Sequence, residues 1–285
     1  MKWRNSRRSD NIDDLRGQGS PRLQGKTKVG GLSLVILIVV GYLSGQNPLQ
    51  LLELALNSGS SKQTPHEVQQ HQLTKDDSTQ FVSVMLASNE DIWNKQLPKQ
   101  ASLRYQEPRL TLFSQQVNSA CGMASSASGP FYCPADHRVY LDLSFFRELQ
   151  NMGAAGDFAQ AYVIAHEIGH HVQSLLGISG QVSQLQQRSS KQKANKLSVL
   201  LELQADCYAG IWAHHSEKNK RWLEKGDLEE GLRAASVIGD DQLQRSAGRR
   251  VNPDAFTHGT SKQRQYWLSM GLKYGNMSRC NTFAK

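Results

Sequence analysis

The pattern of apolar and polar residues divides the chain into an apolar run near its beginning, a polar stretch, and a longer region of mixed periodicity. No charge occurs from Val29 to Leu52, and the centre of this run reads LSLVILIVVGYL. The apolar part at 29–45 is 17 residues long, at the short end of what a helix needs to cross a bilayer. We therefore predict one transmembrane helix there. A cleaved signal peptide and a buried core helix remain as alternatives.

The charge distribution predicts which side of the membrane each part occupies. Residues 1–28 hold eight basic and three acidic side chains, and so carry five of the chain's eight net positive charges. Basic residues before a span favour a cytoplasmic N-terminus and a globular part on the other side. We expect a single-pass inner-membrane protein with a periplasmic domain. Because the rest of the chain is close to neutral, a nucleic-acid partner is not supported.

The remaining periodicity predicts one mainly helical domain with a small sheet. Residues 46–80 are polar and rich in Gln and Ser, which is typical of a flexible tether, so the domain is expected at 81–285. Apolar spacing predicts helices at 81–93, 157–177, 194–214, 227–238 and 260–274, and strands at 109–117 and 138–146. Capping signals predict that three of these helices begin at Asp157, Asp227 and Thr260. Strands before residue 147 and helices after it indicate an α+β fold.

The four cysteines are consistent with an oxidising compartment. Cys121 and Cys133 flank a loop rich in Gly, Ser and Ala, which favours pairing them and leaves Cys207 with Cys280. Three pairings are possible in principle, and four free buried thiols are the alternative for a cytosolic protein.

The helix predicted at 157–177 contains His166-Glu167-Ile168-Gly169-His170. Residues four apart lie on the same face of a helix, so His166 and His170 can bind one metal ion. Glu167 lies beside them, where it can take a proton from a metal-bound water. This is the H-E-x-x-H arrangement of zinc peptidases.

A catalytic zinc ion needs a third protein ligand and an open fourth position. The next long helix supplies Glu202 and Asp206, again four apart, among apolar residues that would hold that helix against the core. We interpret Glu202 as the third ligand, since metal binding removes the cost of burying its carboxylate. Asp206 can then accept the free ring N–H of a zinc-bound histidine. A solvated helix face is the alternative for both residues.

HEIGH followed by ELQAD resembles the gluzincin pattern, H-E-x-x-H and then E-x-x-A-D. The wider resemblance is to the bacterial putative neutral zinc metallopeptidases, which are membrane-anchored. It is carried by SDNIDDLRG, GPFYCPADHRVYLDLSFF, GDFAQAYVIAHEIGHHVQ, ELQADCYAGIWA, GDLEEGLRAASVIGDDQLQ, FTHGTSKQRQYW and CNTFAK. The resemblance implies a zincin-like fold, one zinc ion, and a periplasmic domain behind one span. It does not identify a substrate.

The predicted reaction is peptide hydrolysis. Zinc would lower the pKa of a bound water towards ~7, and Glu167 would pass its proton to the leaving amine. His258, just before a predicted helix, is the candidate donor to the oxyanion, with simple packing or capping as the alternative. The strand at 138–146 is a candidate edge for an extended peptide substrate, although a core position is favoured.

Two other functions remain open on the sequence alone. One is a zinc-stabilised binding or scaffold module at the cell envelope that does not cleave. The other is hydrolysis of non-protein amides, such as the peptide links of a cell wall, by the same zinc chemistry. The presence of Glu167 favours an enzyme over a scaffold, because a general base has no evident structural use at that position.

Overall fold

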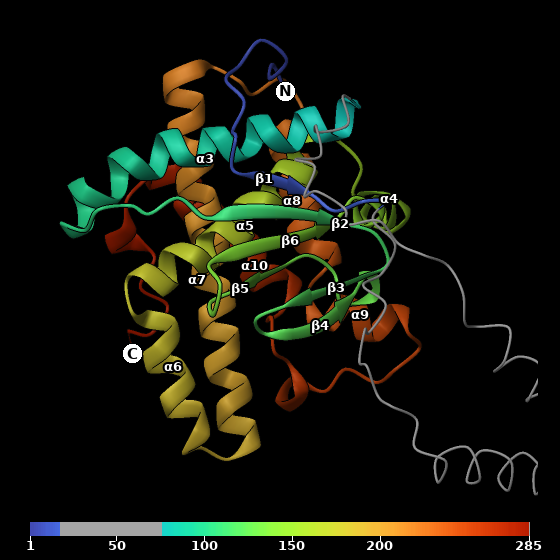
Figure 1. Ribbon diagram of the computed structural model, residues 1–285. Helices are drawn as coiled ribbons and strands as arrows, with labels where there is room; N and C mark the ends of the chain where they lie inside the picture. Colours follow the sequence, from blue (N-terminus) through green and yellow to red (C-terminus); the bar gives the residue numbers. More distant parts are fainter. Residues whose placement is uncertain (18–75, 285) are drawn as a thin grey trace, which may run out of the picture. The chain divides into compact units, whose positions relative to one another are not determined.

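A four-stranded sheet lies against a group of helices in the computed structural model, which describes residues 1–17 and 76–284 (Figure 1). The strand order is β1, β2, β6, β5. Their bounds are Ile12–Asp14 for β1, Arg109–Phe113 for β2, Arg138–Asp142 for β6 and Phe131–Cys133 for β5. The first three are parallel, and β5 is an antiparallel edge strand. Gln116–Ser119 (β3) and Gly122–Ser125 (β4) form a separate hairpin.

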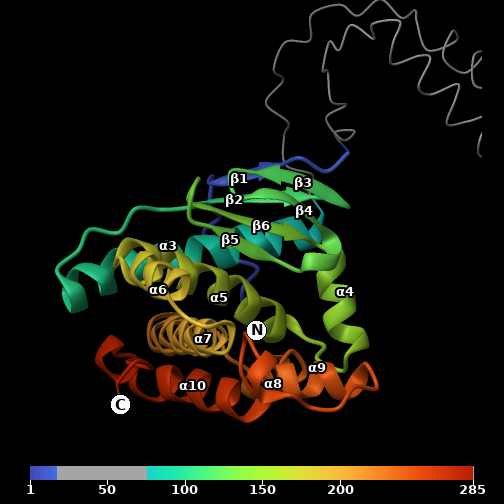
Figure 2. The same ribbon diagram turned by 90° about the horizontal axis from the view of Figure 1, so that it is seen from below.

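Helices make up most of the described chain, which confirms the mainly helical α+β prediction. They are α3 (Asp77–Ala101), α4 (Ser144–Asn151), α5 (Asp157–Leu175), α6 (Ile178–Gln187), α7 (Lys191–Lys220), α8 (Asp227–Val237), α9 (Asp240–Ser246) and α10 (Ser261–Tyr274). Figure 2 shows α5 between the sheet on one side and α7, α8 and α10 on the other. The central position of α5 explains why most of its residues are buried.

The two inner strands bury side chains on both faces. Leu110 and Leu112 of β2 contribute to the main core with the helices, whereas Phe113 contributes to a smaller cluster with Tyr140. Successive side chains of a strand point to opposite faces, so this alternation follows directly from β geometry. A sheet buried on both sides gives α5 a rigid support.

The strand predicted at 138–146 is only partly correct. β6 ends at Asp142 and α4 begins at Ser144, because the Asp142 carboxylate accepts a hydrogen bond from the Ser144 backbone N–H at 2.9 Å and turns the chain. β6 also lies between β2 and β5, so it occupies a core position, and the edges of the sheet are β1 and β5. The strand predicted at 109–117 is likewise interrupted, at Gln115, whose φ is 67°.

Two of the predicted helix caps differ in detail. The N-cap of α5 is Gly156 at φ 119°, and Asp157 is instead the first helical residue. Its carboxylate accepts from the Trp3 indole N–H at 2.9 Å, an interaction that local sequence does not reveal. The N-cap of α8 is likewise Gly226 and not Asp227. The capping box of Thr260 on α10 is confirmed.

Residues 1–17 are part of the folded domain. β1 pairs with β2, the Leu110 N–H donates to the Asn11 carbonyl at 2.8 Å, and the Leu15 N–H donates to the Leu112 carbonyl at 2.8 Å. The Trp3 ring is buried and packs edge-on against Phe81, with ring centroids 5.2 Å apart. The predicted boundary, a tail at 1–28 separate from a domain at 81–285, is therefore wrong for residues 1–17.

The charges of this N-terminal arm explain the difference. Arg7 forms ion pairs with Glu90 and Asp91, so it does not act as a free cation. Asp13 of β1 receives hydrogen bonds from Arg109 and Arg138. The Arg109 bond is the largest influence on the Asp13 carboxyl, whose pKa falls to about 2 despite partial burial. Counting charges along the sequence could not show that charges of this arm pair with charges of the domain.

The span predicted at 29–45 and the tether at 46–80, as far as residue 75, lie outside the described residues. Within residues 1–17 and 76–284, no helix is both long and apolar enough to cross a membrane. The predicted disulfide pairing is confirmed, since Cys121 is bonded to Cys133 and Cys207 to Cys280.

The buried position of Trp3 predicts that the arm stabilises the domain. Trp3→Ala removes a ring that is 5% exposed and should lower the free energy of unfolding by about 3–5 kcal/mol. Urea denaturation of the full-length protein measures this. Met123→Ala is the control, because Met123 is 76% exposed and its loss should change stability by no more than about 0.5 kcal/mol. Equal stability of the two variants would show that the arm is not integrated.

Candidate metal centre

Helices α5 and α7 bring two imidazoles and one carboxylate together. Ligand atoms of His166, His170 and Glu202 all lie within 4.8 Å of one another. Glu202 Oε2 lies 3.1 Å from His166 Nε2, and its Oε1 lies 3.4 Å from His170 Nε2. The three residues predicted as ligands therefore converge on one point, and a His₂Glu donor set of this kind fits zinc with one position left open.

The convergence depends on a close contact between the two helix backbones. A β-carbon added to Gly169 would lie 2.9 Å from the carbonyl oxygen of Ala205 and 3.1 Å from its Cα. Gly169 stands between the two histidines in sequence, and Ala205 stands between Glu202 and Asp206. The absence of a side chain at Gly169 thus lets the four functional groups on either side reach each other.

Each histidine has a hydrogen-bond partner on the far side of its ring. His166 Nδ1 lies 2.8 Å from Asp206 Oδ1, and His170 Nδ1 lies 2.9 Å from Gln173 Oε1. Both partner oxygens are acceptors, so each Nδ1 carries a proton and donates it. In the neutral rings, this leaves the Nε2 lone pairs directed towards Glu202. Asp206 occupies the position expected of it, and Gln173 was not predicted.

A buried ion pair fixes Asp206. Arg264 of α10 donates to its carboxylate through Nε at 2.9 Å and through Nη2 at 2.9 Å, and Tyr162 donates to it at 2.6 Å. Burial would raise the pKa of the Asp206 carboxyl, but Arg264 and His166 outweigh it and lower the pKa to about 2. Asp206 therefore remains a carboxylate in the core. A bidentate guanidinium partner sets its orientation towards His166.

The charges of the site favour a bound cation. Burial disfavours protonation of His166, but Asp206 and Glu202 outweigh it and raise its pKa to about 10. For His170, burial is again outweighed, here by Glu202, and the pKa is raised. The pKa of Glu202 is lowered well below its ordinary value, because the two imidazoles overcome its burial. An environment that stabilises protons on these rings also stabilises a metal ion between them.

Glu167 lies beside the ligands and opens onto a cleft. Its side chain is largely buried and makes no hydrogen bond to another residue of the described chain. A cavity of about 700 Å³ is lined by all three candidate ligands, by Glu167, and by Phe131 at the edge strand. The cleft gives an extended molecule access to the metal position, and the free carboxylate of Glu167 is available to a water molecule there.

His258 lines the same cleft from the loop before α10. Its Nδ1 lies 3.2 Å from Asp240 Oδ1, and the backbone N–H groups of Thr257, His258 and Gly259 all donate to Asp240 Oδ2. The ring is about half exposed. Asp240 thus organises the whole loop and orients the His258 imidazole at the cleft wall.

The other histidines near these elements have structural partners. His171 is buried, donates from Nε2 to the Gln106 carbonyl at 2.6 Å, and accepts from the Tyr132 hydroxyl at 3.0 Å. His214 and His215 donate to backbone carbonyls of α10 and of the residue after it. His171 thus uses both of its ring nitrogens, and His214 and His215 do not belong to the group of described residues that could hold a metal ion.

Three important residues were missed by sequence reasoning. Gln173 follows His170 by three positions, a spacing that places it on the same helix face and was available as a signal. Gly169 occupies one of the two x positions of the H-E-x-x-H motif. The motif allows any residue there, so it gives no sign that this glycine is needed for helix packing. Arg264 is 58 residues from Asp206 in sequence, and no local pattern links the two.

Comparisons with known proteins show which family the chain is similar to. The family model described as putative neutral zinc metallopeptidase matches residues 1–283. Uncharacterized protein YpfJ of Escherichia coli K12 is 45% identical over 298 residues, covering all of this chain and 99% of the relative. Uncharacterized protein Rv2575 of Mycobacterium tuberculosis H37Rv is 40% identical over 223 residues, which is 73% of each chain. No solved structure matches the chain significantly.

The helix contact at Gly169 generates a prediction. Gly169→Ala should destabilise the protein by about 1–3 kcal/mol, because the new methyl group collides with the α7 backbone and not with a flexible side chain. Gly180→Ala is the matched control. That glycine is also helical but has nothing within 4 Å of the added carbon, so the change should stabilise by up to about 1 kcal/mol. Urea denaturation compares the two, and a stabilising Gly169→Ala would disprove the close contact.

Proposed function

This chain belongs to the putative neutral zinc metallopeptidase family, and from that premise we propose that it hydrolyses peptide bonds with one zinc ion held by His166, His170 and Glu202. The observation that carries the proposal is the convergence of these three donors next to a buried, unbonded glutamate in an open cleft. A scaffold role would explain the donor set, but it would leave Glu167 and the cleft without a purpose.

The residues around the metal position divide the chemical work. A zinc ion held by His166, His170 and Glu202 would supply a Lewis acid, which would lower the pKa of a water towards ~7 and polarise the scissile carbonyl. Glu167 takes the proton of the attacking water and delivers it to the leaving amine. Asp206 holds the His166 ring in the tautomer that directs Nε2 to the metal. His258 donates to the developing oxyanion from the cleft wall, in an orientation set by Asp240.

The edge strand β5 is the proposed support for the substrate. It forms one border of the sheet, and Phe131 and Tyr132 line the cleft. An extended peptide can add to a free strand edge through backbone hydrogen bonds. The sequence suggested the strand at 138–146 for this substrate-binding role, but β6 is paired on both edges, so we assign the role to β5. Because the cleft is open, internal peptide bonds are accessible, which supports an endopeptidase with a zincin-like arrangement of helix, cleft and edge strand.

Replacing Glu167 by Gln tests the mechanism. The amide cannot accept the proton, so hydrolysis of a peptide library should fall by about 10²–10⁴-fold. Zinc content, measured by metal analysis of the purified full-length protein, should remain at one ion per chain, because Glu167 is not a ligand. Glu229→Gln on α8 is the control, since this exposed residue is outside the cleft. Unchanged activity of the Glu167 variant would reject the mechanism.

We also propose that residues 1–17 and 76–284 lie on the same side of any membrane and outside the cytoplasm. A strand hydrogen-bonded into a sheet cannot be separated from that sheet by a bilayer, and β1 is such a strand. Two disulfides favour an oxidising compartment for the unit. The proposal keeps the periplasmic domain of the expected topology but replaces its cytoplasmic N-terminus, since one crossing at 29–45 would put the arm and the domain on opposite sides.

Cysteine labelling tests this topology. Asp10→Cys places a thiol on the exposed part of the arm, and Lys262→Cys places one on the exposed face of α10. A membrane-impermeant maleimide added to intact spheroplasts should label both variants to the same extent. Labelling of the Lys262 variant alone would place the arm across the membrane and contradict the shared sheet, whereas labelling of neither would place both parts in the cytoplasm.

A further inference from the structure

The far side of His170 is held by a neutral amide, whereas His166 is held by a carboxylate. Gln173 Oε1 accepts from His170 Nδ1 at 2.9 Å, and the Gln173 side chain is fully buried. Its amide nitrogen donates to the Leu201 carbonyl at 2.7 Å and to Gln204 Oε1 at 3.1 Å. Both of those partners are acceptors, so the amide can have its oxygen only on the histidine side. The tautomer of His170 is thereby fixed.

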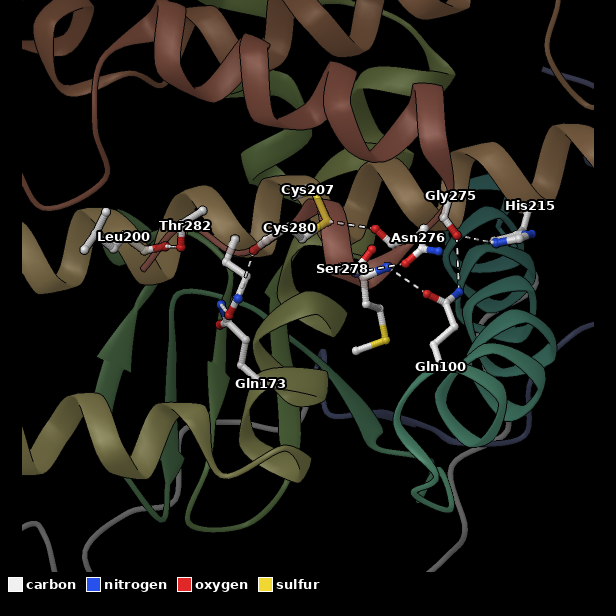
Figure 3. Close-up of a disulfide and its surroundings, with 12 residues drawn as sticks. Gln100, Gln173, Leu200, Cys207, His215, Gly275, Asn276, Ser278, Cys280 and Thr282 are labelled. Carbon is white, nitrogen blue, oxygen red and sulfur yellow. Dashed lines mark hydrogen bonds between the residues drawn. A yellow bond between two sulfur atoms is a disulfide. The ribbon is translucent and has the colours of Figure 1, made fainter. Parts of the chain in front are cut away.

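The hydrogen bonds continue from Gln173 to the C-terminal segment. Gln204 of α7 is 5% exposed, and its amide nitrogen donates to the Cys280 carbonyl at 3.0 Å. Figure 3 shows this segment lying along α7, where the disulfide joins Cys280 to Cys207 and the Thr282 hydroxyl donates to the Leu200 carbonyl. Cys207 follows Gln204 by three positions on α7. The disulfide therefore holds Cys280 about one helical turn from Gln204, whose side chain donates to the Cys280 carbonyl.

We propose that Gln173 and Gln204 are positioning residues that orient His170 for the metal, and that the Cys207–Cys280 disulfide anchors the far end of this relay. The inference rests on the proposed function, because it requires His170 to be a metal ligand. It goes beyond that function by making zinc affinity dependent on a disulfide that does not touch the site.

The chemistry of the relay explains why it needs an anchor. An amide has no charge to favour one orientation, and a flipped Gln173 would present a donor to the His170 ring N–H. The Leu201 carbonyl accepts one amide hydrogen of Gln173, but the second hydrogen has an acceptor only while Gln204 presents its oxygen. Gln204 presents that oxygen while its own nitrogen donates to the Cys280 carbonyl. The side chains of Gln173 and Gln204 are both buried. Losing a hydrogen-bond partner of either amide therefore costs about 1–3 kcal/mol and favours a rearrangement of the side chains. His166 has no such dependence, because Arg264 and Asp206 fix it by charge.

The first test measures zinc affinity by competition with a chelator on the full-length protein. Gln173→Leu removes the acceptor and should weaken zinc binding by about 10–100-fold. Gln173→Glu keeps an acceptor oxygen and should bind zinc more tightly than the Leu variant. Gln160→Leu is the matched control, because Gln160 lies on the same helix and does not contact the ligands. A structural role alone predicts the opposite order, because Gln173→Glu places a buried carboxylate against the Leu201 carbonyl and Gln204 Oε1 and so disturbs the fold more than Gln173→Leu does.

The second test addresses the anchor. The double variant Cys207→Ala and Cys280→Ala should weaken zinc binding, whereas Cys121→Ala with Cys133→Ala, which removes the other disulfide, should not. Gln204→Leu interrupts the relay without touching either disulfide. It should weaken zinc binding to the same degree as the Cys207→Ala and Cys280→Ala double variant. If that double variant does not fold, the zinc affinity of Gln204→Leu alone decides whether the relay exists.

The outcomes separate the two proposals. If the wild-type protein binds zinc and the Gln173, Gln204 and Cys207–Cys280 variants bind it equally tightly, the relay is refuted and the peptidase proposal stands. If the wild-type protein binds no zinc at all, the proposed function itself is wrong and the relay falls with it. A loss of affinity confined to the relay variants establishes the inference.

Discussion

The site depends on the place where α5 and α7 touch backbone to backbone. Gly169 leaves room for the Ala205 carbonyl, and the functional residues stand on both sides of this contact, with His166 and His170 on α5 and Glu202 and Asp206 on α7. Two helices separated by ordinary side chains lie 8–10 Å apart. At that spacing a glutamate on one helix would reach a histidine on the other less closely. The small pair at the crossing therefore converts two sequence motifs into one candidate metal site.

Charge balance explains why the surroundings of this contact are so polar. The buried carboxylate of Asp206 and the partly buried carboxylate of Glu202 face only one permanent cation, Arg264, within the described part of the chain. The remaining negative charge is what raises the pKa of both histidines. Such an arrangement is costly unless a proton or a metal ion balances it. Arg264 pairs with Asp206 and balances its charge. The charge of Glu202 is then balanced only by a proton or a metal ion located between the two imidazoles.

The sequence predicted what is encoded by short-range spacing. His166 and His170, and Glu202 and Asp206, are four apart on helices whose periodicity is clear, so their faces could be derived. Gln173 has the same kind of spacing and was overlooked because its amide carries no charge. The bounds of β6 and α4 were not predictable, since Asp142 ends the strand through a hydrogen bond and apolar residues continue past it. Arg264 and Trp3 were beyond reach, because their partners are far away in sequence.

The N-terminal arm shows that partners far away in sequence also affect the prediction of membrane topology. Its arginines resemble the basic flank of a membrane span, and that interpretation treats each charge as facing solvent. In the fold, Arg7 faces Glu90, and Trp3 donates to Asp157 at the start of the helix that carries both histidines. The arm thus supports α5, which carries both candidate histidine ligands, at its first turn, and it extends the sheet beside that helix. Because the arm completes the fold in this way, its charges pair with individual charged side chains of the domain, and their sum along the sequence is no guide to topology.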